Sequence, residues 1–544
     1  MGLGLFLVGK MALAMATSSL STDEFGTVGS FSSKGPGHVM TDYRAPKNHV
    51  FFNLLNSLLP GRESLAPARV RALSILATAL AALVLVFYGA WRERWMESAI
   101  VLALWSTAPQ SLSLAMEARG YGFLDLFAVL ATVATFEYAA SRHRLWLWIL
   151  SGSITLGVYT IPGFLFFGAP LLLLLWLTER TRGAFAAGAF TAVAILALYA
   201  PLVTQVVAEF TGFHQDKAEA DFASVHALVR AVKLYFFASD DWESWSILLL
   251  LALAPFAAPP IRPRESSALR IVTISCLVYL GILLALKTPP VHVAAFTMLP
   301  LALAGLWAIG GWLRKPAFLR AGACALLALA LGGQLAFAIA TFRFTPSEDW
   351  ALAGRAVDAA FPDSTHVEFK RFAKYLQKTL PRAGQRSADY NDMQFSCGYL
   401  VVADAGNKWA EGDRFTPPKG LDRVVQWVIP GTIRDIDLTL RVLPTNGRPT
   451  APPALADGSA NTGIDVPPEG YTFDCGEPAA GEKALIVLFN RTVTPDELRI
   501  TASGTQPLVA GNALVAPFRQ GAPLRLQIAA GGARLQIVEA WITR

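Results

Sequence analysis

The sequence predicts a polytopic α-helical membrane domain of about eleven transmembrane helices, followed by a C-terminal extracytoplasmic α+β domain that is rich in β-strands. The first observation is composition: of 544 residues, 53% are hydrophobic and only 16% are charged. The mean hydropathy of +0.43 exceeds what a soluble globular chain can bury. The second observation is that the apolar excess ends near Phe342. We therefore assign residues 1–342 to the membrane domain and residues 343–544 to a soluble domain.

Long apolar runs divide the first domain into predicted spans. Their approximate limits are 3–20, 72–90, 96–114, 122–140, 145–160, 162–177, 184–206, 246–260, 271–286, 293–312 and 319–341. Several of these runs are near the lower length limit for crossing a bilayer. The long segments 21–71 and 207–245 connect predicted spans and are assigned as loops of the membrane domain.

Basic residues gather in alternate connections between the runs. They are Arg92 and Arg94; Arg142 and Arg144; Arg180 and Arg182; Arg262, Arg264 and Arg270; and Arg314, Lys315 and Arg320. The positive-inside rule places these connections and the N-terminus in the cytoplasm. The loops 21–71 and 207–245 and the C-terminal domain then face outward, to the periplasmic or extracellular side of a bacterial inner (plasma) membrane. This orientation explains the net charge of +6 without a nucleic-acid partner.

The first apolar run allows more than one interpretation. It is short, contains Lys10 and has no basic residue before the apolar stretch. A signal peptide is one alternative, because Ala14-Met15-Ala16 fits a small-x-small cleavage site. A start codon assigned too late is another. Neither alternative changes the topology predicted for the later runs.

Shorter patterns predict the remaining elements. Residues 49–59 have apolar side chains at helical spacing and are too short to span, so we expect an interfacial amphipathic helix that ends at Pro60. Beyond Arg343, residues 349–361 and 368–380 predict amphipathic helices. Residues 484–489, 497–500 and 524–528 predict strands, which fit a β-sandwich. Cys397 and Cys475 fall in the outward-facing domain, where an oxidising compartment allows a disulfide, and we predict that they form one.

Polar residues gather in four outward-facing turns next to the membrane. They are Asp23, Glu24, Asp42, Arg44, Lys47, Asn48 and His49 in the first turn; Glu117, Arg119 and Tyr121 in the second; Tyr159 and Thr160 in the third; and Lys287 and His292 in the fourth. Charges at these places cost several kcal/mol if they face lipid, so they are expected to face protein, water or a ligand. Each group alone also fits a solvated loop or an interfacial hydrogen bond. Their convergence at one membrane face favours a site for an anionic lipid.

The order of these motifs resembles the GT-C superfamily of membrane glycosyltransferases, which includes protein O-mannosyltransferases and the bacterial transferase that adds aminoarabinose to lipid A. Asp23-Glu24 matches the Asp-Glu pair that follows the first span in this superfamily, and Asn48-His49 matches an element before an amphipathic helix. Residues 71–74, Arg-Ala-Leu-Ser, match the opening of the second span, and residues 117–121 match a Glu-Ala-Arg-Gly-Tyr turn after the third. The chain departs from the pattern at His292, where many members have an Arg-Tyr pair. The resemblance ends near residue 360.

The resemblance implies a hexosyl- or pentosyltransferase that takes a sugar from a polyprenyl phosphate and passes it to a glycan, lipid or protein acceptor outside the membrane. It implies that Asp23 is the base for the acceptor hydroxyl, with Glu24 as its orienting neighbour or substitute. Arg119 would stabilise the leaving phosphate, with Lys47 and Lys287 as further cations. The residues expected to bind substrate are Asp42, Asn48, His49, Glu117, Tyr121 and His292. No cofactor and no divalent metal is expected, since positively charged side chains can stabilise the leaving phosphate in place of a metal ion.

Two other functions stay open. An oligosaccharide-transferring enzyme of the same fold would use a lipid diphosphate with a divalent metal, and would favour the extra acidic residues of the outer loops: Asp216, Glu219, Asp221, Asp240 and Asp241. A non-catalytic membrane protein or lipid-linked-sugar transporter would place charges deep within the spans. Few charges lie there; Lys10 and Glu137 are the main ones, and both are near span ends.

Overall fold

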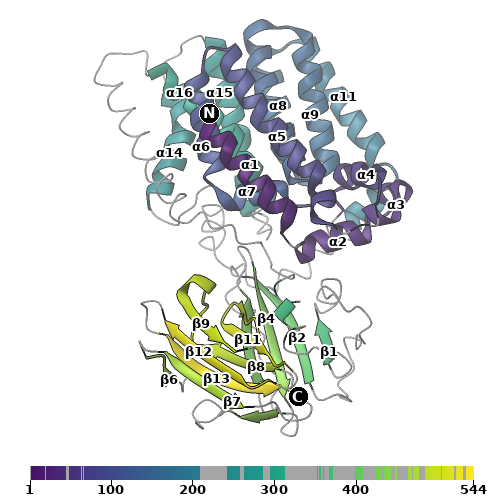
Figure 1. The fold of residues 1–544 in the computed structure, drawn as a ribbon. Coiled ribbons are helices and arrows are strands. Elements are labelled where there is room, and N and C mark those ends of the chain that lie inside the picture. The colour runs from purple at the N-terminus through teal and green to yellow at the C-terminus, as the bar shows by residue number, and fades with distance from the viewer. Residues whose placement is uncertain are drawn as a thin grey trace. The chain divides into compact units, whose positions relative to one another are not determined.

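The computed structural model of the chain describes two compact units. The described residues are 2–18, 20–43, 48–62, 64, 66–208, 242–257, 263–285, 295–312, 352, 355–356, 359, 367–371, 399–407, 424–429, 434–442, 447–449, 464–467, 470–476, 484–503, 505–519, 522–530 and 535–543. One unit comprises Met1–Thr17 and Asp23–Phe344, and the other comprises Ser18–Thr22 and Thr345–Arg544. The first unit is helical and the second is rich in strands (Figure 1).

The first unit is a bundle of α-helices. Its elements are α1 (Gly2–Thr17), α2 (Thr22–Ser30), η1 (Ser32–Lys34), α3 (Pro36–Thr41), α4 (Val50–Leu58), α5 (Pro67–Trp91), α6 (Trp95–Ser106), α7 (Pro109–Met116), α8 (Tyr121–Ser141), α9 (Arg144–Thr160), η2 (Pro162–Phe164), α10 (Leu165–Glu179), α11 (Arg182–Tyr199), α14 (Trp242–Ala257), α15 (Pro263–Ala285) and α16 (Met298–Trp312). Within the described residues, five helices are long and apolar enough to cross a membrane: Pro67–Trp91, Tyr121–Ser141, Pro162–Glu179, Arg182–Tyr199 and Arg264–Leu283. These helices are those of an integral membrane protein.

The predicted run 96–114 is not one span. Pro109 begins α7 and has no N–H to continue the preceding helix, and it disfavours the helical conformation at Ala108, whose φ is −95° and ψ is 84°. The chain therefore forms α6 and then the short helix α7, which ends immediately before Glu117. The predicted run 319–341 lies outside the described residues. The short helix predicted at 49–59 is confirmed as α4.

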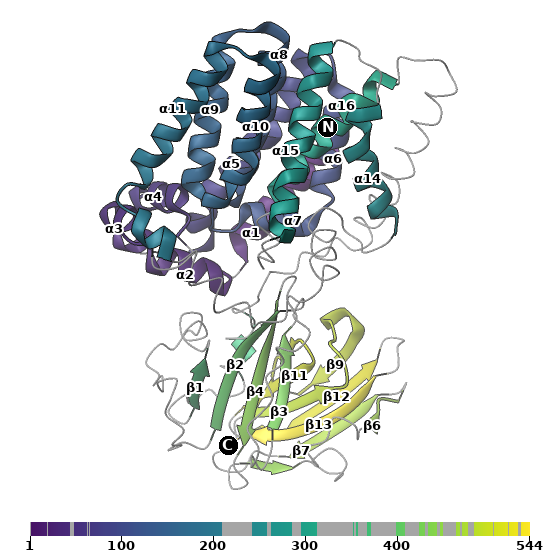
Figure 2. The ribbon, with the colours of Figure 1, turned by 180° about the vertical axis from the view of Figure 1, so that it is seen from behind.

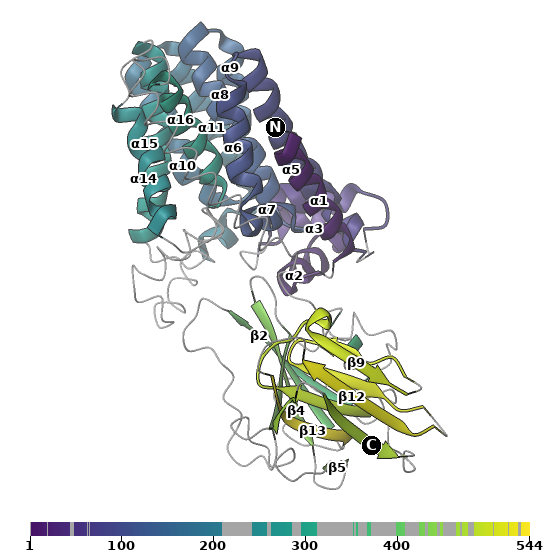
Figure 3. The same cartoon turned by 60° about the vertical axis from the view of Figure 1, so that its left-hand side comes forward.

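Helix α8 is the centre of the bundle, because 89% of the residues in its most apolar stretch are buried. It packs against α5 on one side and α9 on another, and α15 also touches it. Seen from behind, α11 lies beside α9, and α10 lies beside α15 (Figure 2). The short helices α2 and α3 gather at one end of the bundle (Figure 3). At the opposite end, Arg92 forms ion pairs with Glu137 of α8 (Nε–Oε1, 3.0 Å) and with Glu265 of α15 (Nη2–Oε1, 3.6 Å).

The described residues of the second unit form three sheets. Its elements are β1 (Val367–Arg371), β2 (Tyr399–Asn407), β3 (Val424–Ile429), β4 (Arg434–Val442), β5 (Gly447–Pro449), β6 (Ile464–Asp465), β7 (Tyr471–Gly476), β8 (Ala484–Phe489), η6 (Pro495–Glu497), β9 (Leu498–Ala502), β10 (Leu508–Ala510), β11 (Ala513–Pro517), β12 (Leu524–Ala530) and β13 (Gln536–Thr543). The sheet orders are β1-β2-β4-β3, then β10-β11-β8-β13-β5 with β6 on β13, and β7-β12-β9. The predicted strands at 484–489, 497–500 and 524–528 are confirmed as β8, β9 and β12.

Two of these sheets share one hydrophobic core. Leu485, Val487 and Phe489 alternate along β8, and Leu526 and Ile528 alternate along β12; all five side chains belong to the same buried cluster. Because β8 and β12 lie in different sheets, the two sheets pack face to face as a sandwich.

The helix predicted over 368–380 is wrong at its start, where the chain forms β1. Val367 and Phe369 alternate with charged residues, as a strand requires, and β1 pairs in parallel with β2. Pairing with a neighbouring strand overrides the helical pattern of the local sequence. Of the helix predicted over 349–361, residues 352, 355, 356 and 359 are described, and all four are helical.

Candidate functional site

A buried ion pair between Glu24 and Arg71 organises one end of the bundle. Glu24 lies in the first turn of α2, where the helix dipole favours an acid. Its carboxylate accepts hydrogen bonds from Arg71 Nε (2.6 Å) and Nη2 (2.5 Å), and from the backbone N–H of Ala118 (2.6 Å). Arg71 also donates to the carbonyl oxygen of Met15 at the end of α1. These bonds tie α1, α2 and α5 to the turn that follows α7.

Arg71 was matched as part of a motif, but its partner was not anticipated. Glu24 and Arg71 are 47 residues apart in sequence, and both are almost fully buried. The available signal was an arginine directly before an apolar run, since a charge at such a place needs a partner. The sequence alone does not identify the acidic residue that pairs with Arg71.

Asp23 and Arg119 form a second ion pair beside the first. Arg119 Nη1 lies 3.1 Å from Asp23 Oδ2, although the residues are 96 positions apart. The Arg119 guanidinium lies over the ring of Tyr121, with 4.9 Å from Cζ to the ring centroid. The backbone carbonyl oxygen of Arg119 accepts a hydrogen bond from Ser74 Oγ (2.8 Å). Arg119 is only 7% exposed, and its Nε has no hydrogen-bond partner within the described residues.

His49 and two glycines hold the turn that carries Arg119. His49 Nδ1 accepts a hydrogen bond from the Gly120 N–H (2.9 Å), so the neutral ring carries its proton on Nε2. The His49 ring meets Tyr121 edge-on, with ring centroids 5.0 Å apart. A Cβ on Gly120 would overlap the Thr160 methyl group, and one on Gly122 would overlap the Ala115 carbonyl oxygen. The turn fits only with glycine at both positions.

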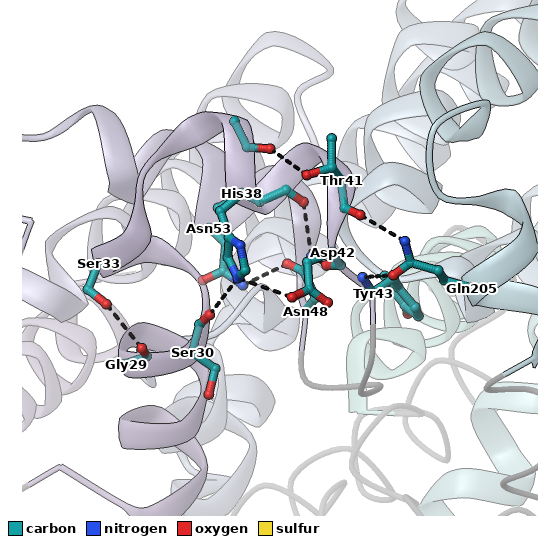
Figure 4. A network of polar contacts seen from close by, with 12 residues as sticks. Gly29, Ser30, Ser33, His38, Thr41, Asp42, Tyr43, Asn48, Asn53 and Gln205 are labelled. Carbon is teal, nitrogen blue, oxygen red and sulfur yellow. Dashed lines mark hydrogen bonds and ion pairs between the residues drawn. The ribbon is translucent and has the colours of Figure 1, made fainter.

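Asn48 and Asp42 organise the loop before α4 (Figure 4). Asn48 Nδ2 donates to the carbonyl oxygens of Val39 (3.1 Å) and Asp42 (2.7 Å), and Asn48 Oδ1 accepts from Asn53 Nδ2 (3.0 Å). Asp42 Oδ2 lies 3.2 Å from His38 Nε2. The Asn48 amide is therefore committed to shaping the loop that presents His49.

Gln205, beyond the end of α11, fastens the same loop. Its Oε1 accepts from the Tyr43 N–H (2.6 Å) and its Nε2 donates to the Thr41 carbonyl oxygen (2.8 Å) (Figure 4). The predicted site residues Lys47, Lys287 and His292 lie outside the described residues, and so does Cys397, so its disulfide with Cys475 stays a prediction.

Glu117 adds a third carboxylate to the cluster. It is 3% exposed and caps the C-terminal end of α7, where the helix dipole opposes a negative charge. Burial, with the nearby charges of Glu24 and Asp23, raises the pKa of Glu117 to about 8 against the opposing effect of Arg119. Burial alone would lower the pKa of Arg119, but Tyr121, Asp23 and Glu117 together raise it, so the guanidinium stays charged.

No group of three or more His, Cys, Asp or Glu side chains in the described part of the chain is arranged to hold a metal ion. The absence of a metal from the reaction remains an expectation. The acidic residues 216, 219, 221, 240 and 241 of the outer loop lie outside the described residues.

No protein-family model and no curated protein matches the chain. Among solved structures, the chain is similar to ArnT from Cupriavidus metallidurans bound to undecaprenyl phosphate, with 14% identity, 81% of this chain and 97% of that chain covered, and a TM-score of 0.43. It is also similar to the oligosaccharyltransferase AglB from Archaeoglobus fulgidus (12% identity, 73% and 69% covered, TM-score 0.42). A third similar structure is the arabinofuranosyltransferase AftD from Mycobacteria (10% identity, 99% and 58% covered, TM-score 0.42).

All three are GT-C glycosyltransferases, and each is less than 15% identical to this chain. The likeness is remote.

Proposed function

We propose that this protein is a membrane glycosyltransferase that moves a sugar from a polyprenyl-phosphate-linked donor to an acceptor hydroxyl on the outer face of a bacterial plasma membrane. The observation that carries the proposal is the pairing of Asp23 with Arg119 in a buried polar cluster at one end of an apolar helix bundle. A carboxylate supplies a base, and a guanidinium supplies a cation for a phosphate. These are the two groups that transfer from a sugar phosphate requires.

Asp23 is the base in this proposal. The acceptor hydroxyl gives its proton to the Asp23 carboxylate as its oxygen bonds to the anomeric carbon. The bond from that carbon to the phosphate oxygen breaks, and its electron pair leaves on the lipid phosphate. The Asp23 side chain is 18% exposed, whereas that of Glu24 is fully buried and accepts three hydrogen bonds. Asp23 is therefore the carboxylate that a hydroxyl can reach, and Glu24 orients α2.

Arg119 is the phosphate ligand in this proposal. The leaving phosphate gains negative charge as the bond breaks, so a cation fixed beside it stabilises the transition state more than the ground state. Arg119 is held in place by Tyr121 and by the Ser74 hydroxyl. Its Nε–H has no partner within the described residues and can donate a hydrogen bond to a phosphate oxygen. A planar guanidinium binds two phosphate oxygens at once.

The Asp23–Arg119 ion pair must open when a donor binds. In a single displacement, the attacking oxygen and the leaving phosphate lie on opposite sides of the anomeric carbon. A sugar placed between the two side chains therefore replaces their direct contact, with the phosphate taking the place of the Asp23 carboxylate on Arg119. We propose Lys47 and Lys287 as further cations, and His49, Tyr121 and His292 as substrate-binding residues; no divalent metal takes part.

Substitution of Asp23 tests the assignment. Asp23→Asn keeps the shape and removes the base, so transfer should fall by about 10²- to 10⁴-fold while the donor lipid still binds. Transfer is measured per folded molecule with envelope lipids as donor and acceptor, the products being identified by mass spectrometry. Asp496→Asn, an exposed position in η6 of the second unit, is the matched control and should retain activity. Near-normal transfer by Asp23→Asn would remove the catalytic assignment.

Substitution of Arg119 tests the cation. Arg119→Lys keeps the charge but loses the planar fork, so both donor binding and turnover should weaken, and Arg119→Ala should weaken them further. If Arg119 only anchors the turn, Arg119→Ala will lower the yield of folded protein, and the molecules that remain will turn over normally.

A further inference from the structure

The ionisable groups around Arg119 are unbalanced in charge. Asp23, Glu24 and Glu117 supply three carboxylates, whereas Arg71 and Arg119 supply two guanidiniums. Fully ionised, these five groups carry a net charge of −1 in a site with little access to water. A phosphate that enters the site adds more negative charge, and in a buried site such repulsion is only weakly screened.

The three carboxylates are not equivalent. Glu24 accepts three hydrogen bonds from Arg71 and the Ala118 N–H, and Asp23 pairs with Arg119, so each of these two carboxylates lies against a guanidinium. The Glu117 carboxyl, in contrast, receives no hydrogen bond within the described residues, and it lies at the negative end of the α7 dipole. Of the three, Glu117 is the one that the structure equips to keep a proton.

The charged groups on the helices around α7 differ in how they are paired. In the described part of the chain, these helices include α1, α5, α6 and α8. Besides Arg71, α5 carries Arg69, which donates to Asn56; α8 carries Glu137, which pairs with Arg92, and the buried Asp125, which the variants below distinguish from Glu117. Helices α1 and α6 have one charged residue each. Lys10 of α1 is exposed, and Glu97 of α6 lies 3.7 Å from Arg94 in an ion pair. Beside the turn, His49 Nδ1 accepts the hydrogen bond that the Gly120 N–H donates.

We propose that Glu117 holds a proton in the resting site and that this proton admits the phosphate of the lipid-linked donor. This inference rests on the proposed function, because it concerns the same phosphate. With Glu117 neutral, Asp23 and Glu24 balance the two arginines, and the phosphate meets Arg119 without a further negative charge nearby. When the glycosidic bond breaks, the released phosphate monoester gains charge, and the neutral Glu117 avoids adding to the repulsion.

The expected pH dependence follows from the pKa of about 8. If only protein with protonated Glu117 binds phosphate, the apparent Kd rises as that fraction falls, by up to about 25-fold between pH 7.5 and 9.5. The probe itself does not titrate in this window, because a phosphate monoester has its second pKa near 6. Glu117→Gln mimics the protonated form, so its Kd should stay flat over the same range.

The test uses the purified full chain in detergent, with a polyprenyl phosphate as the probe. Binding is titrated at several pH values from 7.5 to 9.5 for the wild type, Glu117→Gln and Glu137→Gln. Glu137 is a matched control, a buried glutamate at the other end of α8 that is paired with Arg92, and its variant should keep the wild-type pH dependence. Calorimetry of the wild type at pH 8.5, in two buffers of different ionisation enthalpy, should show proton uptake on binding; this needs no variant.

The outcomes separate the two proposals. Binding that is independent of pH in the wild type, without proton uptake, overturns the proton on Glu117 but leaves the phosphate site intact. Loss of the pH dependence in Asp125→Asn, but not in Glu117→Gln, also overturns it, since Asp125 is a second buried acid on α8. Absence of binding at every pH overturns the proposed donor and this inference together.

Discussion

Breaking the Glu24–Arg71 pair should destabilise the helical unit more than any single surface substitution. Glu24→Gln removes the negative charge and keeps the shape, leaving the Arg71 guanidinium buried without its counter-charge. Arg71→Met removes the positive charge and, with it, the Arg71 Nε and Nη2 hydrogen bonds to the Glu24 carboxylate, while the bond from the Ala118 N–H stays. Replacing both residues removes both charges at once.

The magnitude follows from burial. The side chains of Glu24 and Arg71 are 0% and 1% exposed, so water cannot replace the lost partner. Removing one member of a buried ion pair costs about 3–5 kcal/mol, whereas removing both members is often close to neutral. Each single variant should therefore lose about 5–10 °C in midpoint temperature, and the double variant Glu24→Gln/Arg71→Met should recover much of that loss.

The assay measures the midpoint temperature of thermal unfolding of the purified protein in detergent. The unfolding is followed as the fraction of protein that remains monodisperse after heating. Glu497→Gln provides a matched control, because Arg491 Nη1 and Glu497 Oε2 also form an ion pair (3.1 Å) but their side chains are 37% and 44% exposed. An exposed pair contributes about 0–1 kcal/mol, so this control should shift the midpoint of the second unit by no more than about 4 °C.

Two results would refute the reasoning. A midpoint unchanged in both single variants would mean that the pair is solvated or unformed in the protein. A double variant as unstable as the sum of the singles would mean that the two side chains act independently, contrary to their direct contact.

Three further predictions concern other parts of the chain. Gly120→Ala should lower the folded yield or transfer at least tenfold, because the added Cβ would overlap the Thr160 methyl group, whereas Gly152→Ala, which has open space around it, should change neither. Reporter fusions after Arg144 and after the C-terminus should report cytoplasm and outside respectively, and a cytoplasmic C-terminus would contradict the predicted orientation. Thiol labelling under denaturing, non-reducing conditions should find Cys397 and Cys475 unreactive, since their disulfide would stabilise the domain by up to a few kcal/mol; two reactive thiols would contradict it.

Local pattern was enough to find most helices of the first unit, because an apolar run long enough to cross a bilayer satisfies its backbone only as a helix. It was also enough to find β8 and β12, where apolar residues are bounded by turns. It failed at Pro109, where one apolar run holds two helices. It failed again at β1, where pairing with β2 decided the conformation. Hydrophobicity does not encode either a break within an apolar run or the choice of a strand partner.

The sequence by itself determined which polar residues stand at the ends of apolar runs, and their cost in lipid required that they meet partners. Only the tertiary structure decided the partners: Glu24 with Arg71, Asp23 with Arg119, and His49 with the Gly120 N–H. It also separated the roles of two adjacent acids, leaving Asp23 partly open and burying Glu24. The physical reason is that a pairing between residues 47 to 96 positions apart depends on how the helices pack, and burial and local charge then set the chemistry of each carboxylate.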